Sequence, residues 1–323
     1  MSDPTGESAF LAPDNRAHLP EMTYGGALSF LRRRYSRELA GVDVAVMGVP
    51  FDNAVTNRPG CRLGPRAIRA ASAQLAELKA FPFGFDLMES LAVVDWGDCF
   101  LDPHHPETVA PAVEAAAAAI IATGTRLLTL GGDHFITWPL LRAHAARLGP
   151  LALIHVDAHG DLWPDDPGRM DHGTMMGRAI REGLVDPARS TQIGIRTFHD
   201  EAMGLEILTA PWVHRHGIAA ATETAVARAG EAPVYLSFDI DALDPAFAPG
   251  TGTPVAGGLA SWQALELVRG LAPLDLVGMD LVEVSPPFDH AETTALAAAH
   301  IAHDWLCTLA ARRGVRPVPV GRL

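Results

Sequence analysis

Cysteine and basic residues are scarce in this chain of 323 residues. It has three cysteines, Cys61, Cys99 and Cys307, and they lie far apart. Their number and spacing argue against a disulfide framework or a cysteine-rich zinc site and favour a reducing cytoplasm. Lysine and arginine number 25 against 38 aspartates and glutamates, which gives a formal charge of −13. Without a basic block to meet a phosphate backbone, nucleic-acid binding is disfavoured and small cationic partners are favoured.

Long apolar segments are also absent from the sequence. The longest apolar block, residues 115–130, is broken by Thr-Gly-Thr-Arg at 123–126 and therefore cannot cross a membrane. Residues 1–22 lack the basic start and apolar run of a signal peptide, so we expect an N-terminal arm there. No repeat, low-complexity tract or linker follows, which predicts one domain over residues 23–323.

Short apolar runs alternate with amphipathic segments along the chain. Strands are predicted at residues 42–49, 92–95, 126–130, 151–154, 192–195, 234–238 and 274–279. Helices are predicted at residues 65–79, 108–122, 173–182, 222–229, 261–270 and 293–312, with a further helix beginning near Thr137. This alternation predicts an α/β fold of three layers, in which helices flank a parallel sheet on both faces.

Polar residues follow the predicted strand at 151–154 in the sequence His-Val-Asp-Ala-His-Gly-Asp. If the chain stays extended, alternate side chains share a face, so Asp157, His159 and Asp161 should point the same way. Two carboxylates and an imidazole suit manganese, nickel or zinc better than calcium. The sequence therefore suggests a metal site here, although carboxylates also gather at strand ends by chance.

Two further predicted strands end in residues of the same kinds. Asp239 and Asp241 follow the strand at 234–238, and His134 follows the strand at 126–130, with Thr137 as the expected cap of the next helix. Open α/β sheets bind ligands outside the carboxyl ends of their strands. Four aspartates and two histidines suffice for two metal ions that share carboxylates. Such a pair of ions activates a water molecule near neutral pH, which predicts hydrolysis.

These motifs resemble those of a known family. Gly-Gly-Asp-His at 131–134, the motif at 155–161 and Ser-Phe-Asp-Ile-Asp-Ala-Leu-Asp-Pro at 237–245 resemble, in order and separation, the ureohydrolases, the binuclear manganese enzymes that include arginase and agmatinase. Further segments at 48–52, 62–69, 171–175 and 247–258 are similar to bacterial agmatinases. The resemblance covers about residues 40–312 and implies an arginase-like fold.

The resemblance also implies roles for individual residues. One metal would take His134, Asp157, Asp161 and Asp239, and the other would take Asp157, His159, Asp239 and Asp241. It further implies that His172 gives a proton to the leaving amine and that Glu283 accepts the guanidinium group of the substrate. The expected cofactor is two Mn²⁺ per chain, with Ni²⁺ as an alternative, and the expected assembly is a homotrimer or homohexamer. The implied reaction is hydrolysis of agmatine to putrescine and urea.

One position departs from the family pattern. Agmatinases commonly carry a hydroxyl residue where this chain has Gly160, on the side expected to point away from the metals. Specificity could therefore extend to guanidinobutyrate, guanidinopropionate, guanidine or a biguanide. At the expected pocket mouth, Asp165 and Asp166 against Arg169 favour a cationic substrate. An inactive partner subunit and a single-zinc deacetylase are further alternatives, and the complete ligand set argues against both.

Some acidic and histidine residues near the motifs are expected to have supporting roles. Asp133 and Asp244 are expected to orient ligands or to stabilise turns. Asp280 lies inside an apolar run and needs a partner if it is buried. His155 is expected to be a core histidine outside the site.

Overall fold

The computed structural model describes residues 6–102, 104–166 and 169–315. The first five residues of the expected arm, residues 167 and 168 of the expected pocket mouth, and residues 316–323 of the expected domain lie outside the described residues. The arm residues from 6 onward contain one short helix, α1 (Ser8–Leu11), and the backbone N–H of Leu19 donates a hydrogen bond to the Ser8 hydroxyl at 2.8 Å. Among the described residues, no helix is long and apolar enough to cross a membrane.

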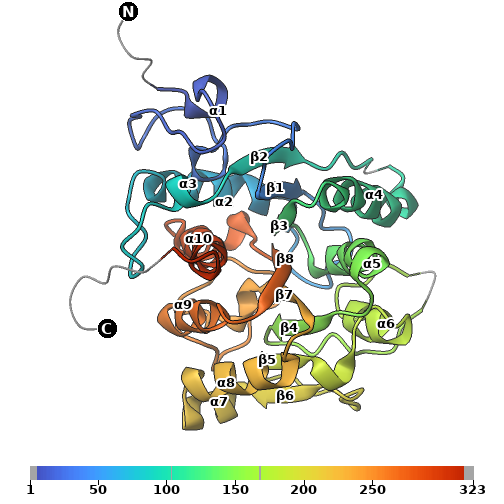
Figure 1. Ribbon diagram of the computed structural model, residues 1–323. Coiled ribbons are helices and arrows are strands. Elements are labelled where there is room, and N and C mark those ends of the chain that lie inside the picture. The colour runs from blue at the N-terminus through green and yellow to red at the C-terminus, as the bar shows by residue number, and fades with distance from the viewer. Residues whose placement is uncertain (1–5, 103, 167–168, 316–323) are drawn as a thin grey trace, which may run out of the picture.

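Eight parallel strands form one sheet at the centre of the molecule (Figure 1), in the order β2-β1-β3-β8-β7-β4-β5-β6. Their bounds are β1 (Val44–Val49), β2 (Val93–Asp98), β3 (Arg126–Gly131), β4 (Ala152–Val156), β5 (Thr191–Ile195), β6 (Glu206–Thr209), β7 (Pro233–Asp239) and β8 (Asp275–Val282). The sheet confirms the predicted α/β class. β6 was not predicted, because this edge strand is half-exposed and lacks an apolar run.

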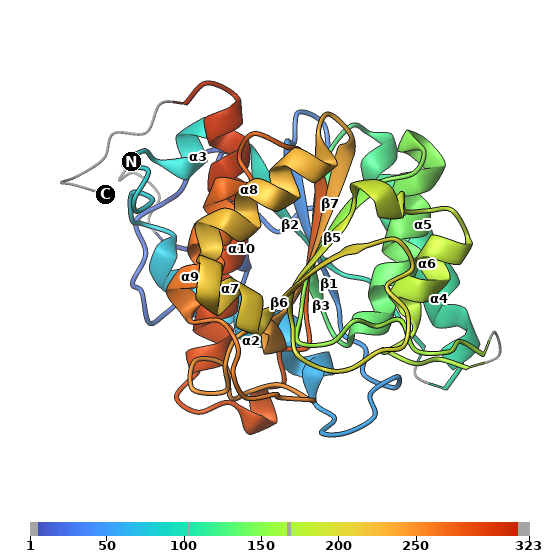
Figure 2. The same cartoon turned by 90° about the horizontal axis from the view of Figure 1, so that it is seen from below.

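Helices cover both faces of the sheet, so the fold has three layers (Figure 2). One layer contains α4 (Val109–Ala122), α5 (Thr137–Leu148) and α6 (Met175–Arg181). The other contains α2 (Gly64–Ser72), α7 (Ala210–His216), α8 (Ile218–Ala229), α9 (Ser261–Gly270) and α10 (Thr293–Arg312), with the short α3 (Leu87–Ser90) beside it. The predicted helix at 65–79 is too long, since α2 ends at Ser72 and continues only as a 3₁₀ turn to Leu75.

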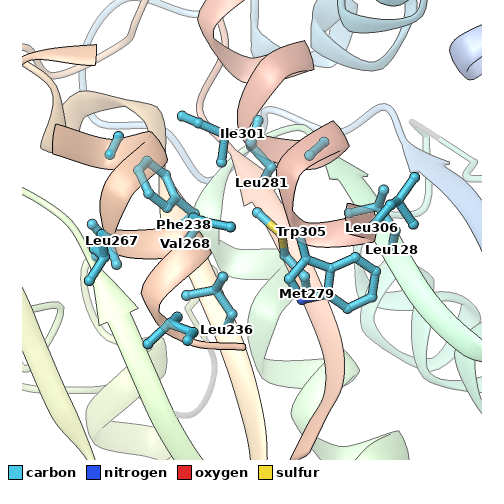
Figure 3. Close-up of a cluster of buried hydrophobic side chains, with 14 of the residues drawn as sticks. Leu128, Leu236, Phe238, Leu267, Val268, Met279, Leu281, Ile301, Trp305 and Leu306 are labelled. Atoms are coloured by element: carbon cyan, nitrogen blue, oxygen red, sulfur yellow. The ribbon is translucent and has the colours of Figure 1, made fainter. Parts of the chain in front are cut away.

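The core on the α9 and α10 side explains why these strands read as continuous apolar runs. Strands buried on both faces have no polar side to alternate with. Leu236 and Phe238 of β7 and Met279 and Leu281 of β8 pack under α9 and α10, where Trp305 is fully buried (Figure 3). Burial of this large side chain from α10 anchors the layer on the central strands.

A buried ion pair holds the amino-terminal segment against the edge of the sheet. Asp95 of β2 is 0% exposed and accepts hydrogen bonds from Arg69 Nε at 2.8 Å and from the backbone N–H of Phe30 at 2.7 Å. Arg69 is itself buried on α2. The pair therefore joins three segments that are distant in sequence, and it sits away from the carboxyl ends of β3, β8, β7 and β4.

Candidate active site

The predicted site residues come together at the carboxyl ends of four neighbouring strands. His134 follows β3, Glu283 follows β8, Asp239 ends β7, and Asp157 follows β4. Because β3, β8, β7 and β4 are adjacent in the sheet, residues far apart in the sequence meet at one edge. All these side chains are buried.

The local backbone differs from the extended geometry that the sequence suggested. β4 ends at Val156, and Asp161 has a left-handed φ of 51°, so residues 157–161 form a turn. The same construction occurs at three strand ends. Oδ1 of Asp133, Asp157 and Asp239 accepts the backbone N–H two residues further along, at 3.1, 2.6 and 2.7 Å. These hydrogen bonds shape the turns. Oδ2 of Asp157 and Oδ2 of Asp239 face His134, whereas Oδ2 of Asp133 accepts the backbone N–H of Ala54 at 2.9 Å.

His134 lies in a 3₁₀ turn before α5, which begins without the expected cap from Thr137. Its Nδ1 lies 3.1 Å from Asp157 Oδ2 and 3.2 Å from both Asp161 Oδ2 and Asp239 Oδ2. Within the described residues this buried nitrogen makes no hydrogen bond of acceptable geometry. Three carboxylate oxygens and one imidazole nitrogen that face one another in this way match the donors of a divalent transition metal.

A second group of donors lies beside the first. Nδ1 of His159 is 3.1 Å from Asp241 Oδ2 and 3.3 Å from Asp157 Oδ1. The candidate ligand atoms of Asp157, His159 and Asp241 all lie within 4.8 Å of one another. Asp157 therefore contributes to both groups, one oxygen to each, which is the arrangement that a shared carboxylate requires.

The two groups together form the metal-type cluster, which consists of His134, Asp157, His159, Asp161, Asp239 and Asp241. Its four aspartates give an excess of buried negative charge. Burial and the charges of Asp241 and Asp157 raise the pKa of Asp239 well above its usual range. Burial would lower the pKa of His159, but the charges and hydrogen bonds of Asp241 and Asp157 outweigh it and raise the pKa to about 12. Both shifts arise because buried carboxylates lie close together, and a divalent ion bound between them would offset part of their negative charge.

His172 and Glu283 meet beside the cluster. Nδ1 of His172 donates to Glu283 Oε1 at 2.7 Å, and its Nε2 lies 2.9 Å from the Thr56 hydroxyl. Burial disfavours the imidazolium, but the hydrogen bond and charge of Glu283 outweigh burial and raise the pKa of His172 to about 9. Glu283 Oε1 also accepts the backbone N–H of His134 at 2.9 Å, whereas Oε2 is buried without a hydrogen-bond partner among the described residues.

A row of polar side chains runs across the strands beneath the cluster. Asp280 of β8, Ser237 of β7, His155 of β4 and Gln192 of β5 are register neighbours, and each is 0% exposed. The Ser237 hydroxyl donates to Asp280 Oδ1 at 2.8 Å, so its oxygen accepts from His134 Nε2, also at 2.8 Å. The Tyr235 hydroxyl donates to the other Asp280 oxygen at 2.9 Å, so the buried Asp280 has the hydrogen-bond partners that its burial was expected to require.

His155 was expected to lie outside the site, and this expectation is wrong. Gln192 Nε2 donates to His155 Nδ1 at 2.9 Å, which leaves His155 Nε2 to donate to Asp157 Oδ2 at 2.8 Å. The histidine therefore orients a carboxylate of the cluster. The His155–Gln192 and Ser237–His134 contacts join different strands, so sequence reasoning could not find them without the strand order. Asp133 and Asp244 accept backbone N–H groups in turns, as expected.

A cavity of about 470 Å³ opens over the cluster. Its lining includes residues from the cluster, His172 and several side chains nearer the rim: Thr56, His134, His159, Asp161, Trp163, Asp171, His172, Gly173, Thr197, Asp239 and Thr253. Asp165 was expected at the mouth, but Arg178 holds its carboxylate at 2.9 and 2.5 Å, and Asp165 does not line the cavity.

Gly160 fits its surroundings for a steric reason. A Cβ atom at this position would lie 2.1 Å from His199 Cδ2. The missing side chain would thus point at His199, away from the metal-type cluster, as expected. Gly160 and His199 consequently form a matched pair, in which the space left by one residue is filled by the other.

The parallel sheet between two helical layers and the histidine–carboxylate cluster at the carboxyl ends of its strands define an α/β protein of the metal-dependent hydrolase type. The family model for the arginase family matches residues 42–307. The chain therefore belongs to the arginase family, which confirms the resemblance seen in its sequence.

Individual relatives point to one branch of this family. The chain is 58% identical over 291 residues to an agmatinase from Chromobacterium violaceum, with 90% of each chain covered. It is similar to the crystal structure of a hypothetical agmatinase from Burkholderia thailandensis, with a TM-score of 0.95, 54% identity and coverage of 96% of this chain and 99% of that one. Proclavaminate amidino hydrolase from Streptomyces clavuligerus has a TM-score of 0.86 and 37% identity, with 90% and 100% covered.

Proposed function

We propose that this chain is a ureohydrolase that hydrolyses agmatine to putrescine and urea with the help of two divalent metal ions. One observation carries the proposal: two groups of metal-type donors, joined through Asp157, share a cavity with the His172–Glu283 pair. The similarity to agmatinases over nine-tenths of the chain supports agmatine as the substrate. The cavity size leaves room for a small guanidino compound.

In this proposal, His134, Asp157, Asp161 and Asp239 hold one ion, and Asp157, His159, Asp239 and Asp241 hold the other. The donor set supports Mn²⁺, with Ni²⁺ as the alternative. When bound, the ions would supply Lewis acidity to activate water and positive charge to stabilise the transition state. The unpartnered Nδ1 of His134 and the raised pKa values of Asp239 and Asp241 support this assignment.

His172 and Glu283 handle the substrate and its proton. The unpartnered Oε2 of Glu283 can accept an N–H of the guanidinium, which would satisfy a buried oxygen that otherwise costs free energy. His172 holds one proton at Nδ1 against Glu283, and its Nε2 accepts the backbone N–H of Thr56 at 3.2 Å and lies 2.9 Å from the Thr56 hydroxyl. A second proton on Nε2 would replace the contact with the Thr56 N–H and would face the cavity beside the hydroxyl. Because the pKa of His172 is raised, the ring is a proton donor near neutral pH, and a leaving amine requires such a donor.

We further propose an oligomeric state and a cellular location for the protein. The arginase-family resemblance supports a homotrimer or homohexamer, and the three widely spaced cysteines and acidic composition support a cytoplasmic location. The substrate is a small cation, in agreement with the negative charge of the chain.

A second substrate class is favoured by one observation. Arg169 is 65% exposed, lies outside the cavity and pairs with the cavity residue Asp171 at 2.9 Å, so a rotation of its side chain would bring a cation to a carboxylate-bearing guanidine. Urea release should be compared for agmatine, arginine, guanidinobutyrate, guanidinopropionate, guanidine and a biguanide, with manganese and with nickel. We expect agmatine to have the highest kcat/KM. A different best substrate under both metals would refute the agmatinase assignment but leave a ureohydrolase.

A further inference from the structure

Three carboxylates line the cavity, and two of them belong to the metal-type cluster. Asp161 and Asp239 face His134 Nδ1 and are assigned above to a metal ion. Asp171 is the third, and among the described residues it forms no hydrogen bond or ion pair with His134 or His159. Asp171 is therefore the carboxylate that the cavity presents to a part of the substrate away from the guanidinium.

The two oxygens of Asp171 have different duties. Oδ1 accepts the backbone N–H of Gly173 at 2.9 Å and so shapes the turn that carries His172. Oδ2 lies 2.9 Å from Nη2 of Arg169, whose side chain is 65% exposed and does not line the cavity. An ion pair with such an exposed arginine is weak and screened by water, so another cation can replace it.

The surroundings of Asp171 fit a short alkyl chain. The Trp163 ring packs over Gly173, since a Cβ atom on this glycine would lie 2.8 Å from Trp163 Cε3. Trp163 also contacts the His159 ring, with the two ring centres 6.1 Å apart. An apolar wall thus extends from the metal-type cluster toward the turn that holds Asp171. Asp165, the other acidic candidate of this loop, is held by Arg178 outside the cavity.

We propose that Asp171 binds the distal ammonium group of the substrate, that Trp163 contacts the methylene chain, and that Arg169 is the cation displaced on binding. This inference rests on the proposed function, because agmatine carries a guanidinium at one end and an ammonium at the other. It makes Asp171 a specificity-determining residue that selects alkylguanidines with a positive distal end over those with a neutral or negative one.

Asp171→Asn tests the proposal directly. Asparagine keeps an Oδ1 acceptor for Gly173 and removes the charge, so the turn is retained. We expect Asp171→Asn to lower kcat/KM for agmatine about ten- to hundredfold, mainly by raising KM, because this is the usual contribution of a hydrogen bond to a charged group. The rate with butylguanidine, which has no distal charge, should change less than about twofold, because only the distal contact is removed. The ratio of guanidinobutyrate to agmatine hydrolysis should rise.

Two companion variants separate recognition from folding. Asp200→Asn makes the same change at an exposed position three residues beyond the cavity residue Thr197 and should leave the substrate ratios unchanged. Arg169→Gln removes the competing cation and should lower KM for agmatine but not for butylguanidine. This variant tests the displacement even if Asp171→Asn folds poorly.

The possible failures are distinguishable. If the wild-type protein hydrolyses agmatine and Asp171→Asn loses activity equally toward agmatine and butylguanidine, the carboxylate only shapes the turn and the inference is wrong. An unchanged KM for agmatine in Arg169→Gln would overturn the displacement. If the wild-type protein hydrolyses other guanidines but not agmatine, both the proposed substrate and this inference fail.

Discussion

The contact between Ser237 and His134 makes a quantitative prediction about metal affinity. The Ser237 hydroxyl donates to buried Asp280 and accepts from His134 Nε2, at 2.8 Å in each case. This arrangement keeps the ring proton on Nε2 and leaves the lone pair on Nδ1, which faces the three carboxylates. Ser237→Ala would remove both hydrogen bonds at once and free the ring to change tautomer.

The size of the effect follows from burial. Ser237, His134 and Asp280 are each at most 1% exposed, so water does not replace the lost partner. A buried polar group left unpaired costs about 1–3 kcal/mol. Loss of such an outer contact to a metal-ligating histidine typically lowers metal affinity about 10- to 100-fold. We expect a decrease of this size for manganese in Ser237→Ala.

The assay is a chelator competition that measures the dissociation constant for manganese, combined with thermal unfolding with and without the ion. Bound metal stabilises the folded state according to its affinity, so the metal-dependent rise in Tm should shrink in Ser237→Ala. Tyr235→Phe is the matched control, because it removes the other hydroxyl that donates to Asp280 and leaves the His134 contact intact. Equal losses in both variants, or no loss in Ser237→Ala, would refute the reasoning.

Four further variants test other parts of the site and the fold. His172→Asn should keep both ions, by elemental analysis, and lose about 100-fold in kcat, because it removes the proton donor; an unchanged kcat would assign proton transfer elsewhere. Asp239→Asn should lower metal occupancy and turnover together, and full occupancy with a normal rate would show that this carboxylate is not shared. Glu283→Gln should move the pKa of His172 down from about 9 toward 6.5. Because the pKa of His172 is raised in the folded state, the His172–Glu283 pair stabilises the metal-free protein fully below pH 6.5, and this stabilisation is lost as the pH rises through about 9. The Tm of metal-free Glu283→Gln should therefore be lower than that of the wild type below pH 6.5 and should approach it above pH 9. Arg69→Met leaves Asp95 buried without its cation and should cost about 3–5 kcal/mol in denaturant unfolding, and a cost below about 1 kcal/mol would contradict the pairing.

Much of the fold could be predicted because its central strands are buried on both faces. Residues such as Leu236 and Met279 make these strands read as apolar runs. The edge strand β6 and the adjoining α7 were missed for the opposite reason. In β6 only Leu208 is fully buried, so the segment shows neither an apolar run nor a clear alternation.

The site could be predicted in composition but not in detail. The spacing of Asp157 and His159 correctly indicated that their side chains lie close together. They do so because β4 ends at Val156 and Asp157 accepts the backbone N–H of His159 in a turn, and not because the chain stays extended. Contacts across the sheet, such as His155 with Gln192, depend on which strands are neighbours. Strand order is set by packing of the whole chain, and local sequence carries no record of it.

The polar row beneath the cluster also bears on how the sheet finds its alignment. Parallel strands that are apolar on both faces give little preference for one register over another, since a one-residue slip exchanges one apolar residue for the next. Asp280, Ser237, His155 and Gln192 break this degeneracy, because a slipped strand would leave a buried carboxylate or amide without its partner. We therefore expect the residues beneath the histidine–carboxylate cluster to favour one strand register during folding. Replacing all four with apolar residues should lower the uniqueness of the register more than the compactness of the chain.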